Sequence, residues 1–69
     1  MKSDVYVKLM QRVMILLSEG PLSLKELVEQ TRVEQKQVYR VLSSLHRSSR
    51  VVQYRDPDGV RRYKLIEES

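Results

Sequence analysis

Residues 34–47, EQKQVYRVLSSLHR, decide the fold expected of this chain. Wound as an α-helix at about 100° per residue, the segment places apolar side chains at the spacing i, i+3, i+4 and i+7. This buried stripe consists of Val38, Val41, Leu42 and Leu45. A separate row on the other side consists of Lys36, Arg40, Ser43 and Arg47. A helix that packs by one face and shows cations and small hydroxyls on the other suits a polyanion, which predicts a recognition helix for nucleic acid.

The composition is that of one small globular domain, expected over residues 1–69. The chain is 41% hydrophobic and 32% charged, and a core of this size gains stability from self-association. The longest apolar run, residues 13–17, is far shorter than the roughly 18 residues that span a bilayer. We therefore expect no membrane contact, and no secretory signal is visible. The chain has no cysteine, so we expect an intracellular, cytoplasmic protein, associated with the nucleoid if bacterial or archaeal.

The net charge of +4 lies entirely in the second half of the chain. Residues 1–34 hold five cations and five acids, whereas residues 35–69 hold eight cations and four acids. Between Glu34 and Asp56 there is no acidic residue. This pattern is typical of a surface that meets phosphate.

A first helix is expected over residues 4–18, with Ser3 or Asp4 as its cap and with Gly20 and Pro21 after its end. Helical periodicity places six residues on its buried half. They are Tyr6, Leu9, Met10, Val13, Leu16 and Leu17.

Ile15 projects roughly opposite to that buried half, with Val7 and Met14 on its flank. Two interpretations stay open. A single exposed isoleucine is common on protein surfaces and needs no partner. Alternatively, Val7, Met14 and Ile15 form the contact surface of a homodimer.

The clearest start signal is the S-x-x-E capping box of Ser23 and Glu26. It predicts a short second helix over residues 24–30. A turn of three residues then leads into the third helix, expected over residues 34–48. Two helices joined by such a turn form a helix-turn-helix unit.

Residues 51–55 and 60–66 show the shorter period of strands, which predicts an antiparallel hairpin. Pro57 suits position i+1 of a type I turn, and Gly59 suits the left-handed residue that follows, giving a three-residue loop with a bulge. The expected core face carries Val51, Tyr63 and Leu65. The other face carries Tyr54, Arg62 and Lys64. A slip of one residue would exchange the two faces.

Three helices followed by a two-stranded antiparallel hairpin resemble a winged helix-turn-helix domain, an α+β fold that is mainly α. The resemblance covers about residues 5–66. It rests on the stretches RVMILLSEGPLSLKELVEQT, VEQKQVYRVLSSLHRSSRVV and YRDPDGVRRYKLI. These are similar to the DNA-binding modules of the MarR, ArsR, IclR and TrmB groups of transcription regulators.

In that family the third helix enters the major groove and the hairpin, or wing, lies along the backbone or minor groove. The resemblance implies groove-facing positions for Lys36, Gln37, Tyr39, Arg40, Ser43 and Ser44. It implies wing contacts for Arg55, Arg61 and Arg62. Arg47 shares the face of the third helix with Lys36 and Arg40, and is expected to contact phosphate.

Base recognition would come from side chains that reach base edges in the groove. Arg40 can bind guanine, Gln37 can bind adenine, and Ser43 or Ser44 can bind either. Two interpretations stay open for Tyr39, which either packs on a sugar or thymine methyl or belongs partly to the core.

The chain departs from the family at three positions. Arg32 and Ser49 stand where glycine is common, and Glu34 replaces the Ser or Thr that usually opens the recognition helix. The segment QVYRVLSSL followed by a basic hairpin also resembles the Z-DNA-binding winged helices, at scaffold positions. Where that family carries a groove-facing Asn and Tyr, this chain has Tyr39 and Ser43.

No enzyme, metal site or cofactor is expected. His46 is the only histidine and no cysteine is present, so a zinc site lacks its usual ligands. The chain shows no nucleophile motif, no glycine-rich phosphate loop and no acid pair suited to catalysis. No small-molecule ligand is evident.

The sequence therefore predicts a small transcription regulator that binds double-stranded DNA sequence-specifically, as a homodimer. The rival is a winged helix used as a protein interaction module in a transcription or replication assembly, since one fold can serve both uses. The basic third helix favours DNA, because a docking helix more often exposes Leu, Phe or Trp. Single-stranded nucleic acid is disfavoured by the small number of aromatic residues.

Overall fold

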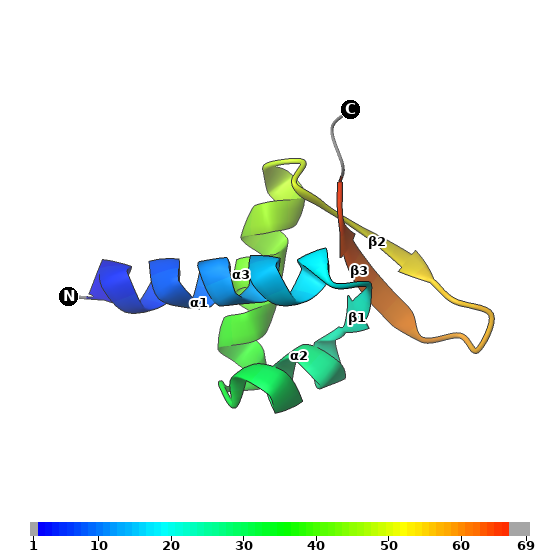
Figure 1. The fold of residues 1–69 in the computed structure, drawn as a ribbon, viewed down its shortest axis with the longest axis horizontal. Coiled ribbons are helices and arrows are strands. Elements are labelled where there is room, and N and C mark those ends of the chain that lie inside the picture. The colour runs from blue at the N-terminus through cyan, green and yellow to red at the C-terminus, as the bar shows by residue number, and fades with distance from the viewer. Residues whose placement is uncertain (1, 67–69) are drawn as a thin grey trace.

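The computed structural model describes residues 2–66, and the side chains of residues 4–66. Its elements are α1 (Lys2–Ser18), β1 (Leu22–Ser23), α2 (Leu24–Thr31), α3 (Gln35–Arg47), β2 (Val51–Arg55) and β3 (Arg61–Leu65). The strands form an antiparallel sheet in the order β1-β3-β2. Figure 1 shows the hairpin of β2 and β3 extending away from the three helices as a wing. The expected winged helix-turn-helix fold is confirmed.

The boundaries differ from expectation by two residues at the start of α1, and by one at the end of α2 and at both ends of α3 and β3. Asp4 lies inside the first turn of α1 instead of capping it, and the side chain of Ser3 lies outside the described residues. Thr31 was expected in the turn but extends α2. Its buried hydroxyl donates to the Leu27 carbonyl at 2.8 Å and accepts from the Val33 N–H at 3.3 Å, which couples the helix end to the turn.

The strand β1 was not expected from the sequence. Leu22 pairs with Tyr63, and Ser23 pairs with Arg62. Two residues are too few to show an alternating pattern, so the strand exists only through its pairing with β3. Its consequence is that β3 becomes the central strand and the capping residue Ser23 is fixed beside the wing.

The core forms where the three helices meet the base of the wing. Its buried apolar residues are Leu9, Val13 and Leu17 of α1, Leu27 of α2, Val38, Val41, Leu42 and Leu45 of α3, and Val51 and Tyr63 of the wing. The stripe expected on the third helix is therefore confirmed. Tyr6 was wrongly placed in the core and is 37% exposed. The first turns of α1 extend beyond α2 and α3 (Figure 1), and a cavity lies between Tyr6 and α3, so the ring of Tyr6 stays partly exposed.

The hairpin has the expected register and turn. Val51 pairs with Leu65 and Tyr54 with Arg62, so each lies on the face predicted. In the turn, the Gly59 N–H donates to the Asp56 carbonyl at 2.9 Å, and Gly59 has a φ of 84°. This is the geometry that the Pro57-Asp58-Gly59 loop predicts.

Two residues other than glycine adopt the left-handed conformation, and both are positions where the family often has glycine. Arg32 and Ser49 each have a φ of 59°. After α3, the Arg50 N–H donates to the Leu45 carbonyl at 2.9 Å and the Ser49 N–H to the His46 carbonyl at 3.1 Å. These bonds form a Schellman motif with Ser49 at its left-handed position. Both residues therefore adopt a conformation that glycine reaches without strain, and each bears the steric cost of its Cβ atom there.

Candidate nucleic-acid interface

The outward face of α3 carries the residues that the sequence predicted there. Of the predicted residues, Lys36, Gln37, Tyr39, Arg40 and Arg47 are exposed, and Ser43 and Ser44 are partly buried. Tyr39 is 53% exposed and does not belong to the core. No acidic residue lies on this helix. The face is therefore positive along its whole length.

The wing adds a pair of adjacent arginines. Arg55 and Arg61 lie directly opposite each other across β2 and β3, and both are exposed. Like charges opposite each other destabilise a hairpin, and neither forms an ion pair with the side chains described over residues 4–66. A bound anion between them would remove this repulsion.

Arg62 behaves differently from its neighbour Arg61. Its Nη1 lies 2.7 Å from Glu26 Oε1, and its Nε lies 2.7 Å from Asp56 Oδ2. Arg62 thus links the first turn of α2 to the turn of the wing. Over residues 4–66 it is the only cation that forms an ion pair.

Both carboxylates in this network have further partners. Glu26 Oε1 also accepts the Ser23 N–H at 2.9 Å, while Ser23 Oγ accepts the Glu26 N–H at 3.2 Å, so the predicted capping box is present. The Ser23 N–H and then Arg62 hold the pKa of Glu26 below its ordinary 4.5, against the effect of burial. Arg62 and the Val60 N–H likewise lower the pKa of Asp56 from 3.8. Both groups are therefore anionic at neutral pH.

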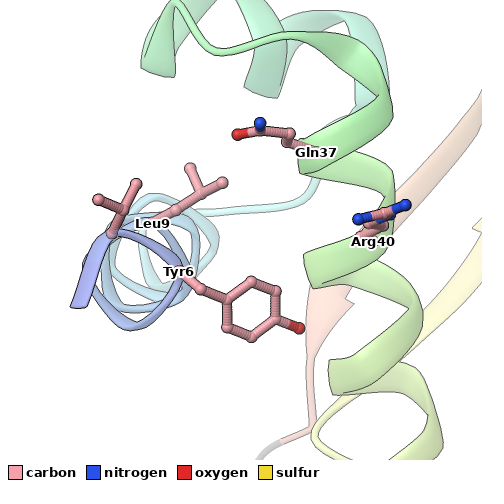
Figure 2. Close-up of a pocket in the computed structure, with 5 residues that line it drawn as sticks. Tyr6, Leu9, Gln37 and Arg40 are labelled. Carbon is pink, nitrogen blue, oxygen red and sulfur yellow. The ribbon is translucent and has the colours of Figure 1, made fainter. Parts of the chain in front are cut away.

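A cavity of about 450 Å³ separates α1 from the start of α3. Val5, Tyr6 and Leu9 line it from α1, and Gln37 and Arg40 line it from α3. The ring of Tyr6 projects from α1 toward α3 (Figure 2). Two of the residues expected to recognise bases thus border a mainly apolar space.

A second cavity, of about 160 Å³, lies between α3 and the wing. The helix contributes Tyr39, Leu42, Ser43, His46 and Arg47, and the wing contributes Gln53 and Tyr63. Gln53 and Tyr63 are cross-strand partners. Burial raises the pKa of the Tyr63 hydroxyl, while the nearby Arg61 guanidinium opposes the shift. Residues of α3 and residues of the basic wing therefore line the same cavity.

Four residues of this second cavity were not predicted as site residues. His46 was set aside as a metal ligand, Leu42 and Tyr63 were assigned to the core, and Gln53 carried no assignment. Tyr63 is indeed 5% exposed, yet it also borders the cavity. The hairpin register held the missing signal, because it places Gln53 on the same face as Tyr63, toward α3.

Two searches of the described residues gave negative results. No group of three or more His, Cys, Asp or Glu side chains within this part of the chain is arranged to hold a metal ion. No helix in the same part is both long and apolar enough to cross a membrane.

Sequence comparison identifies the family. The model of the RNA polymerase III subunit RPC82 helix-turn-helix domain matches residues 4–55, well over half of the chain. The chain belongs to this family. Among curated proteins, none matches the chain by sequence.

Solved structures of the same fold accompany this family match. The adhesin competence repressor AdcR of Streptococcus pyogenes superposes with a TM-score of 0.82 at 21% identity, over 86% of this chain and 46% of that one. The apo-Zalpha domain of zebrafish PKZ gives 0.84 at 20%, over 91% and 98%. The regulator YodB of B. subtilis gives 0.79 at 23%, over 96% and 72%. At these identities the likeness shows the fold, and the chain spans less than half of the length of AdcR.

Proposed function

We propose that this member of the RPC82 helix-turn-helix family binds double-stranded DNA sequence-specifically, as a small transcription regulator. The observation that carries the proposal is the exposed, acid-free face of α3 continued by the Arg55 and Arg61 pair of the wing. Apart from Arg62, the cations described over residues 4–66 have no carboxylate partner. They are therefore available to phosphate.

In this arrangement α3 enters the major groove and the wing lies on the backbone. Arg40 and Gln37 are the residues for base edges, since they are exposed on one face of α3. Lys36 and Arg47 bind phosphate, which positions the helix without reading sequence. Arg62 was predicted to contact DNA from the wing, and we instead assign it to holding the wing on α2, because its guanidinium already binds two carboxylates.

A duplex titration of the variant Lys36→Ala with Arg40→Ala tests the proposal. We expect binding to weaken by at least about tenfold, with the melting temperature nearly unchanged because both side chains are exposed. The control is Lys25→Ala, which removes an exposed cation of α2 and leaves both α3 and the proposed dimer surface on α1 intact. Unchanged affinity together with a lower melting temperature would show that the α3 face is structural.

We also propose a homodimer formed through α1. Val7 is 47% and Ile15 is 63% exposed, and Met14 is partly buried on the same helix. One winged helix covers only about 600 to 1,000 Å² of its own surface on DNA, and a second copy would add a second half-site. Sedimentation should show a dimer that Ile15→Lys converts to a monomer, and a wild-type monomer would contradict the proposal.

The second candidate function is a docking module within a transcription assembly. It is favoured by the family match, which names a subunit of an RNA polymerase, and by the exposed Val5, Val7 and Ile15 of α1. A docking module would bind its partner through α1 and would tolerate Lys36→Ala with Arg40→Ala. The same variants therefore separate the two functions.

A further inference from the structure

The cavity between α3 and the wing is walled by groups that donate hydrogen bonds. Tyr39, Ser43 and Tyr63 offer hydroxyls, Gln53 offers an amide and Arg47 offers a guanidinium. Leu42 is the only aliphatic residue of the wall, and no carboxylate lines it. A wall with many donors and no carboxylate favours an anion over a cation or an apolar group.

The surrounding charge has the same sign. Arg47 is part of the wall, and Arg61 lies close enough to act on the Tyr63 hydroxyl. The acid-free run between Glu34 and Asp56 supplies six of the seven wall residues. The volume of about 160 Å³ is several times the roughly 30 Å³ that one water occupies in the liquid, so a tetrahedral oxyanion has room.

We propose that this cavity binds one phosphate group of a nucleic-acid backbone. Arg47 supplies the opposite charge from α3, and Gln53 and Tyr63 supply directed donors from the wing. This inference rests on the proposed DNA binding and adds to it, because one phosphate held from both sides fixes the angle between α3 and the wing. It also gives roles to Gln53 and Tyr63, which the sequence did not indicate.

The sharpest test is Tyr63→Phe, which removes the hydroxyl and keeps the ring that packs in the core. Because a hydrogen bond to a charged group is lost, we expect duplex affinity to fall roughly tenfold, equally for specific and random sequences. The matched control is Tyr54→Phe, which removes a hydroxyl from the opposite face of the hairpin and should leave affinity unchanged. Melting curves of both variants should match the wild type. Wild-type affinity in Tyr63→Phe would overturn the proposal.

Duplexes with single methylphosphonate substitutions identify the phosphate. A methylphosphonate at one position of the duplex should weaken binding of the wild type. The same substitution should cause little further loss of affinity in Tyr63→Phe, because that variant has already lost the contact. Independent losses from the two changes would mean that the phosphate lies elsewhere.

Experiments with inorganic phosphate distinguish a cavity that binds a backbone phosphate from one that binds a free anion. At constant ionic strength it should displace duplex more effectively than chloride and shift the side-chain amide signals of Gln53 in NMR spectra. If inorganic phosphate shifts Gln53 but the wild type binds no duplex, the proposed function fails and the anion is a free one. If the duplex binds without shifting the NMR signals of Gln53, and Tyr63→Phe binds it with wild-type affinity, then DNA binding stands and the cavity is not its phosphate site.

Discussion

The wing meets the helices on two sides, and the two contacts use charge in opposite ways. On the side of α2, Arg62 binds Glu26 of that helix and Asp56 of the wing's own turn, each at 2.7 Å. Toward α3, hydroxyls, an amide and Arg47 surround a cavity without a carboxylate in its wall. In the first contact the guanidinium of Arg62 is bound by carboxylates of the protein itself. In the second contact no carboxylate of the cavity wall binds the hydrogen-bond donors. The number of basic residues in the wing therefore overstates the number of phosphates that it can bind.

The neighbouring residues Arg61 and Arg62 allow the strongest test of this difference. Arg62→Ala should lower the melting temperature most, because it leaves two carboxylates without their cation. Arg61→Ala should leave the melting temperature unchanged or slightly raised, since it relieves the repulsion with Arg55. Thermal melting combined with duplex titrations against salt should show that only Arg61→Ala reduces the salt slope, by about 0.9 for one lost phosphate contact.

A cation outside both contacts provides the control for this pair. Lys25→Ala removes an exposed charge from α2 and should change neither the melting temperature nor the salt slope. Equal reductions of the salt slope by Arg61→Ala and Arg62→Ala would show that Arg62 exchanges its internal partners for phosphate. Both sides of the wing would then supply cations to phosphate.

The contact with α2 should also weaken in acid. The pKa values of Glu26 and Asp56 are lowered from 4.5 and 3.8 in the folded state, so their contribution to stability is fully present above those values. It is lost as the pH falls through the lowered folded-state values, where the carboxylates become protonated. Melting temperatures measured from pH 7 to pH 2 should therefore fall less steeply in Arg62→Gln than in the wild type. Parallel curves would contradict a role for Arg62 in this acid sensitivity.

The sequence predicted the parts of this comparison that depend on local pattern. The stripe of α3 follows from helical spacing, and the turn at Pro57 and Gly59 follows from their backbone preferences. Together with the alternation of β3, that turn fixed which side of the wing faces the helices. The basic row of α3 followed from the same helical spacing, whereas the wing contacts of Arg55, Arg61 and Arg62 were implied by the resemblance to winged helix-turn-helix domains.

The remaining parts depend on contacts between distant segments. Arg62 and Glu26 are 36 positions apart, and no spacing rule links the two residues. Tyr6 has the right helical phase for burial, but periodicity does not say where the covering helices end. The cavity beside Gln53 required both the register and the position of α3, which only the folded chain combines.

The same contrast extends to the helices behind the two contacts. The helix α2 begins with a complete capping box, whereas α3 begins at Glu34 with no side-chain cap. Glu34→Ser should therefore stabilise the fold by about 1 kcal/mol, as a new N-cap does. It should also tighten duplex binding at low salt, because it removes a carboxylate beside the basic face. Denaturant melts and titrations of Glu34→Gln, which loses the charge without gaining a good cap, separate the two effects.

The smallest effect is expected at the link between α3 and β2, which borders the open side of the wing. The left-handed backbone of Ser49 destabilises the folded state by roughly 1 to 2 kcal/mol. Glycine removes this strain, but its greater freedom in the unfolded chain costs roughly 0.5 to 1 kcal/mol of stability. Ser49→Gly should thus gain about 0 to 1.5 kcal/mol, with a central value below 1, and leave the salt slope unchanged, because no cation is removed. Ser48→Gly, at a φ of −82°, should lose stability instead. A melting temperature that moves in the same direction for both variants would mean that chain freedom, and not the conformation of Ser49, controls this link.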